Sequence, residues 1–212
     1  MSNALNPALI IGLGGSGVEI ARRFRRRLVR DYPDSPHVRV IGIDTDPQQI
    51  DREDSPRLPD SSFYHAGNFN MAQYVSERSI GNFPQIRAWW RGYHSLPASY
   101  IAVGAGQRRP IGRLALFVHF NGVKALLERE LRAIFSASTF AQLSSDQRQR
   151  LTVYIVGSTC GGTGTGMFLD IAYVARQLVP EIVTQATPQV RGVLLMPSLF
   201  IGTQQVPQAN RE

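Results

Sequence analysis

Two glycine-rich segments constrain the fold of this chain most strongly, because each one separates an apolar run from an amphipathic run. The first segment is Ile11-Gly12-Leu13-Gly14-Gly15-Ser16-Gly17, and the second extends from Gly157 to Gly166. Glycine allows a tight turn and a close approach of backbones. An apolar strand, a tight turn and a helix in this order are typical of a parallel strand–helix unit. The two segments therefore predict an α/β fold.

The rest of the chain repeats this pattern. Apolar runs predict strands at 9–12, 38–43, 151–156 and 190–196, and three- and four-residue apolar spacing predicts helices at 18–30, 110–135 and 166–178. Weaker helical patterns cover 70–79 and 83–91, residues 100–103 form a short apolar run, and the polar stretches 48–62 and 136–150 favour loops. We expect one domain over 1–212, a doubly wound, mainly parallel sheet that binds its ligand at the carboxyl ends of the strands.

Composition narrows the class of protein. A chain of 212 residues that is 43% hydrophobic and 18% charged is typical of a globular domain. The sequence has no apolar run of membrane-spanning length, and its start lacks signal-peptide features. The single Cys160 excludes an internal disulfide framework and a multi-cysteine metal site. We expect a cytoplasmic protein.

The basic charge concentrates in one helix. The formal net charge is +7, and arginines are densest between Arg22 and Arg30. Val18, Ala21, Phe24 and Leu28 form the apolar stripe of the same helix, so the arginines occupy its other faces. We interpret them as a solvated face or one that meets an acidic partner. The alternative of a nucleic-acid site has no recognition motif to support it.

The first glycine segment has two interpretations. Backbone N–H groups at a helix N-terminus bind phosphate, and Ser16 adds a hydroxyl. Gly12 to Gly17 also fits the G-x-G-x-x-G dinucleotide fingerprint, and Asp44 at the end of the second predicted strand is placed to bind a ribose hydroxyl. Taken alone, this half of the chain favours an NAD-dependent oxidoreductase of the Rossmann type.

The second glycine segment argues against a dinucleotide. Gly161-Gly162-Thr163-Gly164-Thr165-Gly166 supplies further N–H groups and two hydroxyls at another helix N-terminus. A nucleoside diphosphate or triphosphate uses two such cradles, whereas the pyrophosphate of a dinucleotide needs one. The segment is no Walker A loop, because Met167 stands where that motif has lysine.

These motifs carry a family resemblance. Gly161 to Gly166 resembles the signature loop of the tubulin and FtsZ superfamily, and Gly12 to Gly17 resembles its first phosphate loop. Asp44 to Asp46, Gly104 to Gln107 and Leu195 to Ser198 resemble three further nucleotide loops of that superfamily. The resemblance spans nearly the whole chain and is strongest to bacterial tubulin-like proteins. It implies the nucleotide-binding domain of such a protein, with GTP or GDP and Mg²⁺ as cofactors.

The resemblance also assigns roles to residues. The second turn, Gly161 to Gly166, would hold the α- and β-phosphates, and the first turn, Gly14 to Gly17, would close on them. The loop from Gly104 to Gln107, called the third loop below, would contact the γ-phosphate through the N–H groups of Ala105 to Gln107. Asp46 would orient water on Mg²⁺. Arg108 and Arg109 are either charge-neutralising or surface residues. The binding residues implied are Gly12, Gly14, Gly15, Ser16, Gly17, Glu19, Asp44, Asp46, Gly104, Ala105, Gly106, Gln107, Gly161, Gly162, Thr163, Gly164, Thr165, Gly166, Pro197 and Ser198.

The sequence departs from the family in three places. Cys160 stands where the family often has glycine, and we interpret it as a packing residue. Thr203 and Pro207 replace the acidic residues of the ribose loop. Glu19 or Ile20 stands where the family has the asparagine with which it recognises guanine; Glu19 either accepts from the base or is a favourable acid in the first turn of the helix.

The resemblance also implies what lies outside 1–212. The family continues into a central helix and a C-terminal domain, whose acidic loop acts on the GTP of the next subunit. We therefore expect nucleotide binding without a catalytic residue in this chain, GTP hydrolysis only in an assembled full-length form, homo-oligomers or filaments, and exposed apolar surface where the central helix packs. The second functional hypothesis is a nucleotide-dependent sensor or scaffold that forms no filaments. The third is an NAD-dependent oxidoreductase.

Overall fold

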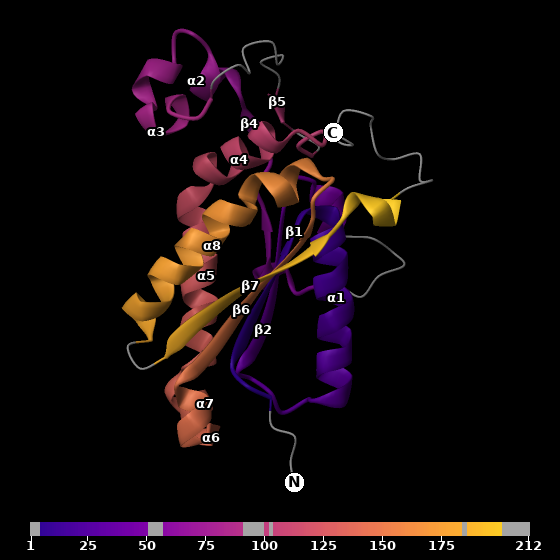
Figure 1. Ribbon diagram of the computed structural model, residues 1–212, viewed down its shortest axis with the longest axis vertical. Coiled ribbons are helices and arrows are strands. Elements are labelled where there is room, and N and C mark those ends of the chain that lie inside the picture. The colour runs from indigo at the N-terminus through magenta and orange to yellow at the C-terminus, as the bar shows by residue number, and fades with distance from the viewer. Residues whose placement is uncertain (1–4, 51–56, 91–99, 102–103, 184–185, 201–212) are drawn as a thin grey trace.

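The computed structural model describes residues 5–50, 57–90, 100–101, 104–183 and 186–200. They form a three-layer α/β structure in which helices cover both faces of a central sheet (Figure 1).

The central sheet is parallel throughout and has the order β3-β2-β1-β6-β7. Its strands are β1 (Ala8–Leu13), β2 (Val38–Asp44), β3 (Phe63–His65), β6 (Arg150–Ser158) and β7 (Thr187–Leu195). From β1 the chain builds the sheet outward through β2 and β3, and β6 and β7 then extend it on the other side. This order confirms the doubly wound α/β fold and places the topological switch between β1 and β6.

Helices form the two outer layers (Figure 1). On one face, α1 (Gly14–Asp31) packs against β1, β2 and β6. On the other, α5 (Phe120–Ile134) contacts β1, β2 and β3, α8 (Gly162–Ile182) contacts β6 and β7, and α4 (Arg109–Val118) packs on α8.

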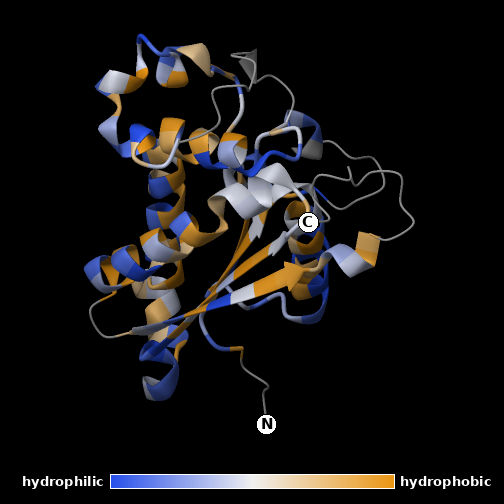
Figure 2. Cartoon of the chain, turned by 45° about the horizontal axis from the view of Figure 1, so that its top comes forward, coloured by the Kyte–Doolittle hydropathy of each residue, from blue (hydrophilic) through white to orange (hydrophobic). Residues whose placement is uncertain are grey.

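Successive side chains of β1 point to opposite faces of the sheet and so contribute to both hydrophobic cores. Leu9 and Ile11 belong to the core beneath α5 and α8, whereas Ala8 and Ile10 belong to the smaller core beneath α1. Figure 2 shows hydrophobic residues along the strands and along parts of the helices beside them, with hydrophilic residues on the other parts of those helices. Both faces of the central strand are buried, as expected for a parallel sheet with helices on each side.

Shorter elements flank the sheet. Strands β4 (Phe69–Asn70) and β5 (Tyr100–Ile101) pair antiparallel. The other short elements are α2 (Ala72–Val75), α3 (Pro84–Arg87), α6 (Ala137–Gln142), α7 (Ser145–Arg148), and the 3-10 turns η1 (Pro47–Ile50), η2 (Asp60–Ser62), η3 (Ile80–Asn82) and η4 (Pro197–Phe200). No helix in the described ranges is both long and apolar enough to cross a membrane.

Several sequence expectations about elements need correction. The helices expected at 70–79 and 83–91 are much shorter, since α2 covers only Ala72–Val75 and α3 only Pro84–Arg87. The single helix expected at 110–135 is two helices, because the backbone of His119 leaves helical geometry (φ −98°, ψ 14°). The stretch 136–150 is not all loop, since Ser144 and Gln147 form a capping box at the start of α7. Helices expected at 18 and 166 begin earlier, at Gly14 and Gly162, so the glycines lie inside the first helical turns.

Candidate functional site

The two glycine segments meet in one cavity at the carboxyl edge of the sheet. The cavity has a volume of about 70 Å³ and lies between the ends of β1 and β6, which is the topological switch point. Its lining comes entirely from the two segments: Leu13, Gly14, Gly15 and Ser16 from the first, and Ser158, Gly161, Gly162, Thr163 and Gly164 from the second.

The two turns approach so closely that they require glycine. Gly14 has φ +69°, and a Cβ atom there would lie 3.1 Å from the backbone nitrogen of Gly164. A Cβ atom at Gly164 would lie 3.0 Å from the carbonyl oxygen of Leu13. The turns are therefore two walls of one site.

Backbone N–H groups are the main hydrogen-bond donors that this cavity offers to a ligand. Neither α1 nor α8 has a side-chain cap or an acidic residue in its first turn. Among the described residues, no acceptor is recorded for the N–H groups of Gly14, Gly15, Ser16, Gly162, Thr163 and Gly164. The positive ends of two helix dipoles thus face one small space, which favours an anion.

A hydrogen-bonded turn after β2 braces the second segment. Asp44 ends β2 and is only 3% exposed, and its Oδ1 accepts from the N–H groups of Thr45 (2.7 Å) and Asp46 (3.3 Å). Burial raises the pKa of Asp44 to about 6, and these N–H groups oppose the rise. The hydroxyls of Thr45 and Thr163 are 2.6 Å apart, so this turn fixes the start of α8.

The third loop lies against the second glycine segment. Gly104, Gly106 and Gln107 have positive φ, and the N–H of Gly104 donates to the carbonyl of Thr45 (3.2 Å). A Cβ atom added to Gly162 would lie 3.0 Å from the Cβ of Ala105. The structure thus brings this loop together with the turn after β2 and both glycine segments.

Several predicted binding residues lie behind the cavity rather than on its wall. A Cβ at Gly12 would overlap the carbonyl of Gly17, a Cβ at Gly17 would overlap the carbonyl of Val156, and Gly166 lies against the backbone of α4. These glycines permit close packing of α1 on β6 and of α8 on α4. Thr165 directs its hydroxyl to the carbonyl of Gly161 at the helix start.

Two further predicted contacts lie away from the phosphate cavity. Glu19 is on the second turn of α1, where its Oε1 is 2.5 Å from the Nε of Arg23. Pro197 and Ser198 are in η4, after β7. The N–H of Thr159 donates to the carbonyl of Leu195 (3.0 Å), which ties the β7 end to the second glycine segment.

The described residues fit a phosphate-bound metal better than a metal held by protein alone. They contain no group of three or more His, Cys, Asp or Glu side chains that could hold an ion. Asp46 follows β2, and its Oδ1 accepts from the N–H of Gln48 (3.0 Å). Mg²⁺ binds through one or two carboxylates, phosphate oxygens and waters, so a single carboxylate suits it.

Sequence reasoning did not single out Ser158 as a site residue. Ser158 lines the cavity, and its hydroxyl accepts from the N–H of Cys160 (3.1 Å). Its place inside the glycine-rich segment Gly157 to Gly166 was the available signal. Cys160 itself is buried, in keeping with packing, and Thr203 and Pro207 lie outside the described residues.

The comparison with protein families agrees with these motifs. A family model described as "Tubulin like" matches residues 9–212. A solved structure of CetZ from Methanosaeta thermophila strain DSM 6194 aligns with 15% identity and a TM-score of 0.49, covering 90% of this chain and 37% of that one. No curated protein matches. The family match extends over nearly the whole chain, and this chain therefore belongs to the tubulin-like family.

Proposed function

We propose that this chain binds a guanine nucleotide, GTP or GDP with Mg²⁺, through its phosphate tail. The observation that carries the proposal is the convergence of two uncapped helix N-termini on one cavity. At about 70 Å³ the cavity is far smaller than the roughly 300–1,000 Å³ typical of whole-ligand sites. It suits phosphate groups, with the ribose and base outside along the strand ends.

Each loop has a role in this proposal. The N–H groups of Gly14 to Ser16 and of Gly162 to Gly164 hold the α- and β-phosphates, and the loop from Gly104 to Gln107 contacts the γ-phosphate. Mg²⁺ supplies charge neutralisation at the phosphates, and Asp46 orients one of its waters. The choice of guanine rests on membership of the tubulin-like family.

Assembly is the larger part of the proposal. In a longer form, the protein would polymerise in the cytoplasm of a bacterium and hydrolyse GTP between subunits, with the hydrolytic acid supplied by the neighbouring subunit. Light scattering of such a form with GTP tests this part. Nucleotide binding without assembly over a range of protein concentrations would favour a sensor or scaffold instead.

The structure argues against the dinucleotide alternative. An NAD site of this type needs a carboxylate that is free to bind a ribose hydroxyl. Asp44 occupies that position, but its side chain is buried and bonded to its own turn. The second turn also supplies N–H groups that a dinucleotide pyrophosphate does not need.

A substitution at Gly161 tests the site with little effect on the fold. Gly161 lines the cavity, has extended backbone geometry (φ −86°, ψ 150°), and no atom lies within 4 Å of a Cβ built there. Gly161→Val therefore extends a side chain into open space beside the cavity. We expect calorimetry to show GTP binding that is at least about tenfold weaker in this variant.

The matched control is Gly81→Val, because Gly81 likewise has no neighbour within 4 Å of its Cβ position but lies in η3, outside the cavity lining. This variant should bind GTP like the parent chain. Titrations with ATP and NAD accompany the GTP series. Binding of NAD without binding of either triphosphate would refute the proposal, as would unchanged GTP affinity in a folded Gly161→Val variant.

A further inference from the structure

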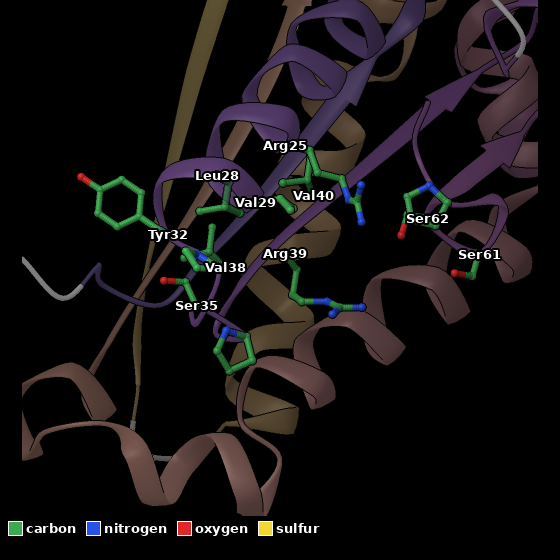
Figure 3. Close-up of a pocket in the computed structure, with 13 residues that line it drawn as sticks. Arg25, Leu28, Val29, Tyr32, Ser35, Val38, Arg39, Val40, Ser61 and Ser62 are labelled. Atoms are coloured by element: carbon green, nitrogen blue, oxygen red, sulfur yellow. The ribbon is translucent and has the colours of Figure 1, made fainter. Parts of the chain in front are cut away.

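A second cavity lies near the amino-terminal ends of the strands, whereas the glycine segments lie at their carboxyl ends. It has a volume of about 260 Å³ and is formed by the C-terminal half of α1, the start of β2 and the η2 turn (Figure 3). The cavity opens beside Val38, at the start of β2, whereas the nucleotide loops follow Asp44 at its end. At about 3.3 Å a residue, this strand separates the two places by about 20 Å.

A buried carboxylate anchors one arginine of this cavity. Glu130 on α5 is 2% exposed, and its Oε2 accepts from the Nε of Arg39 (2.7 Å). Its Oε1 accepts from the Nη2 (2.7 Å) and Nε (3.0 Å) of Arg129. Both carboxylate oxygens are therefore occupied. Arg39 is held by its Nε alone, and its two terminal NH₂ groups donate to no described residue.

A second arginine has no partner at all in the described part of the chain. Arg25 lines the cavity from α1 and makes no hydrogen bond or ion pair with a described residue. Figure 3 shows the guanidinium groups of Arg25 and Arg39 extending toward Ser61 and Ser62. The hydroxyl of Ser62 likewise has no described partner, although the residue is 6% exposed.

The charge around this cavity is not balanced. Arg25, Arg39 and Arg129 are three cations, and Glu130 is the one carboxylate that two of them share. Of the acidic residues next to the lining in sequence, Asp31 pairs with Arg30 and Asp60 with Arg57, whereas Asp34, between Pro33 and Ser35, is exposed and has no ion pair with a described residue. Counting Glu130 and Asp34 against Arg25, Arg39 and Arg129 still leaves one positive charge. An anion that entered the cavity would thus meet uncompensated positive charge.

The floor of the cavity is apolar. Leu28, Val38 and Val40 line it and are each less than a tenth exposed. We propose that this cavity binds a small organic anion, with its phosphate or carboxylate group between Arg25, Arg39 and Ser62 and its apolar part on Leu28, Val38 and Val40. Guanidinium groups bind phosphate and carboxylate by paired N–H donors, and anchoring through Glu130 orients those of Arg39 in advance.

Residue-resolved NMR titration of the ¹⁵N-labelled chain tests this site. The probes are phenyl phosphate and benzoate, which share the apolar ring and differ in the anionic group. We expect saturable shifts at the amides of Arg39, Val40, Ser61 and Ser62. A phosphate probe that also enters the glycine segments shifts the amides of Gly14 and Gly164, so the two sites are scored separately.

Arg25→Gln should weaken binding at this cavity at least about fivefold, because it removes the unpaired guanidinium. Arg26→Gln is the matched control: it removes the same charge from the neighbouring position of α1, and Arg26 does not line the cavity. Its affinity should stay within about twofold of the parent.

The possible results of the titrations either support or overturn the proposed anion site. Saturable binding of either probe that depends on Arg25 supports the site, and the tighter probe identifies the anionic group. Equal losses in the two arginine variants would show unspecific attraction to a basic helix and overturn the proposal. Absence of shifts around Ser61 and Ser62 at millimolar probe would also overturn it. Neither result bears on GTP binding at the glycine segments.

Discussion

At the scale of single residues, the glycines of the second turn meet different constraints. Gly161 has open space around its Cβ position, whereas a Cβ on Gly162 would lie 2.6 Å from the backbone nitrogen of Arg108. Backbone atoms cannot move aside as a flexible side chain can. Gly162 is thus required by the packing of the third loop, and Gly161 faces the place where we expect phosphate.

This difference predicts losses of stability of different size at the two positions. Gly162→Ala should lower the free energy of unfolding by about 1–3 kcal/mol, since the added methyl group overpacks a backbone contact. Gly161→Ala should lower it by less than about 1 kcal/mol, the usual cost of a weaker helix cap. Urea unfolding of the two variants measures both values. Equal values would contradict the close contact between α8 and the third loop.

We expect His119 to make the stability of the fold depend on pH. Its ring packs edge-on against Tyr64 and Phe69, with centroids 5.8 and 5.9 Å away. Burial lowers the pKa of His119, and the nearby His65 acts in the same direction. Below the unfolded-state pKa of about 6.5, the unfolded chain therefore binds a proton more readily than the folded chain.

The free energy of unfolding should consequently fall as the pH drops through 6.5 toward the lower pKa of His119 in the folded chain. Above about pH 7.5, His119 is neutral in both states and adds no pH dependence. His119→Gln should lose less stability than the parent chain between pH 7.5 and pH 5.5. Thermal denaturation across that range measures the difference between the two proteins. A constant difference at all pH values would show that His119 has no part in the pH dependence.

At the scale of elements, the strands of the sheet differ in protection. Strand β1 lies in the middle, and Leu9 and Ile11 are fully buried, whereas β7 has no described neighbour on its outer side. Val193 and Leu194 of β7 are 45% and 39% exposed. Local opening of β7 therefore exposes little additional apolar surface, while opening of β1 disrupts both cores.

Amide hydrogen exchange should follow this order. We expect the amides of Ile10 and Ile11 to exchange only with global unfolding, and those of Val193 and Leu194 to exchange at least about tenfold faster. Exchange measured by NMR resolves the two strands in one sample. Equal protection of β1 and β7 would mean that the outer edge of β7 is covered in solution.

At the scale of the whole molecule, apolar side chains gather at one edge. Val193, Leu194, Met196 and Leu199, around the end of β7 and in η4, are between 39% and 65% exposed. No described residue covers these four side chains. Apolar patches on open sheet edges promote association.

The chain should therefore self-associate as its concentration rises. Combined Leu194→Lys and Met196→Lys substitutions should return it to a monomer, because charges on an edge strand oppose pairing. Sedimentation velocity over a concentration series measures the effect. Phe120→Lys, at an exposed apolar residue of α5 away from this edge, is the control and should leave association unchanged. A parent chain that stays monomeric at high concentration would refute the prediction.

The sequence predicted the features that depend on neighbouring residues. Four of the five strands of the sheet, the helices after both glycine segments and the family resemblance follow from local order, because apolar periodicity and turn chemistry act over a few residues. Strand β3 escaped prediction since only three residues form it. His119 interrupts a continuous helical pattern, and its ring contacts Tyr64 and Phe69, which are distant in the chain.

The tertiary structure alone decided which residues share a site. Thr45 and Thr163 are 118 residues apart in sequence and 2.6 Å apart at their hydroxyls, and Arg39 reaches Glu130 across 91 residues. Asp44 looked available to a ligand but is buried against its own turn. Such pairings depend on how strands and helices stack, which no local pattern encodes. The sequence by itself thus determined two glycine-rich turns between a strand and a helix, and only their packing made them one cavity.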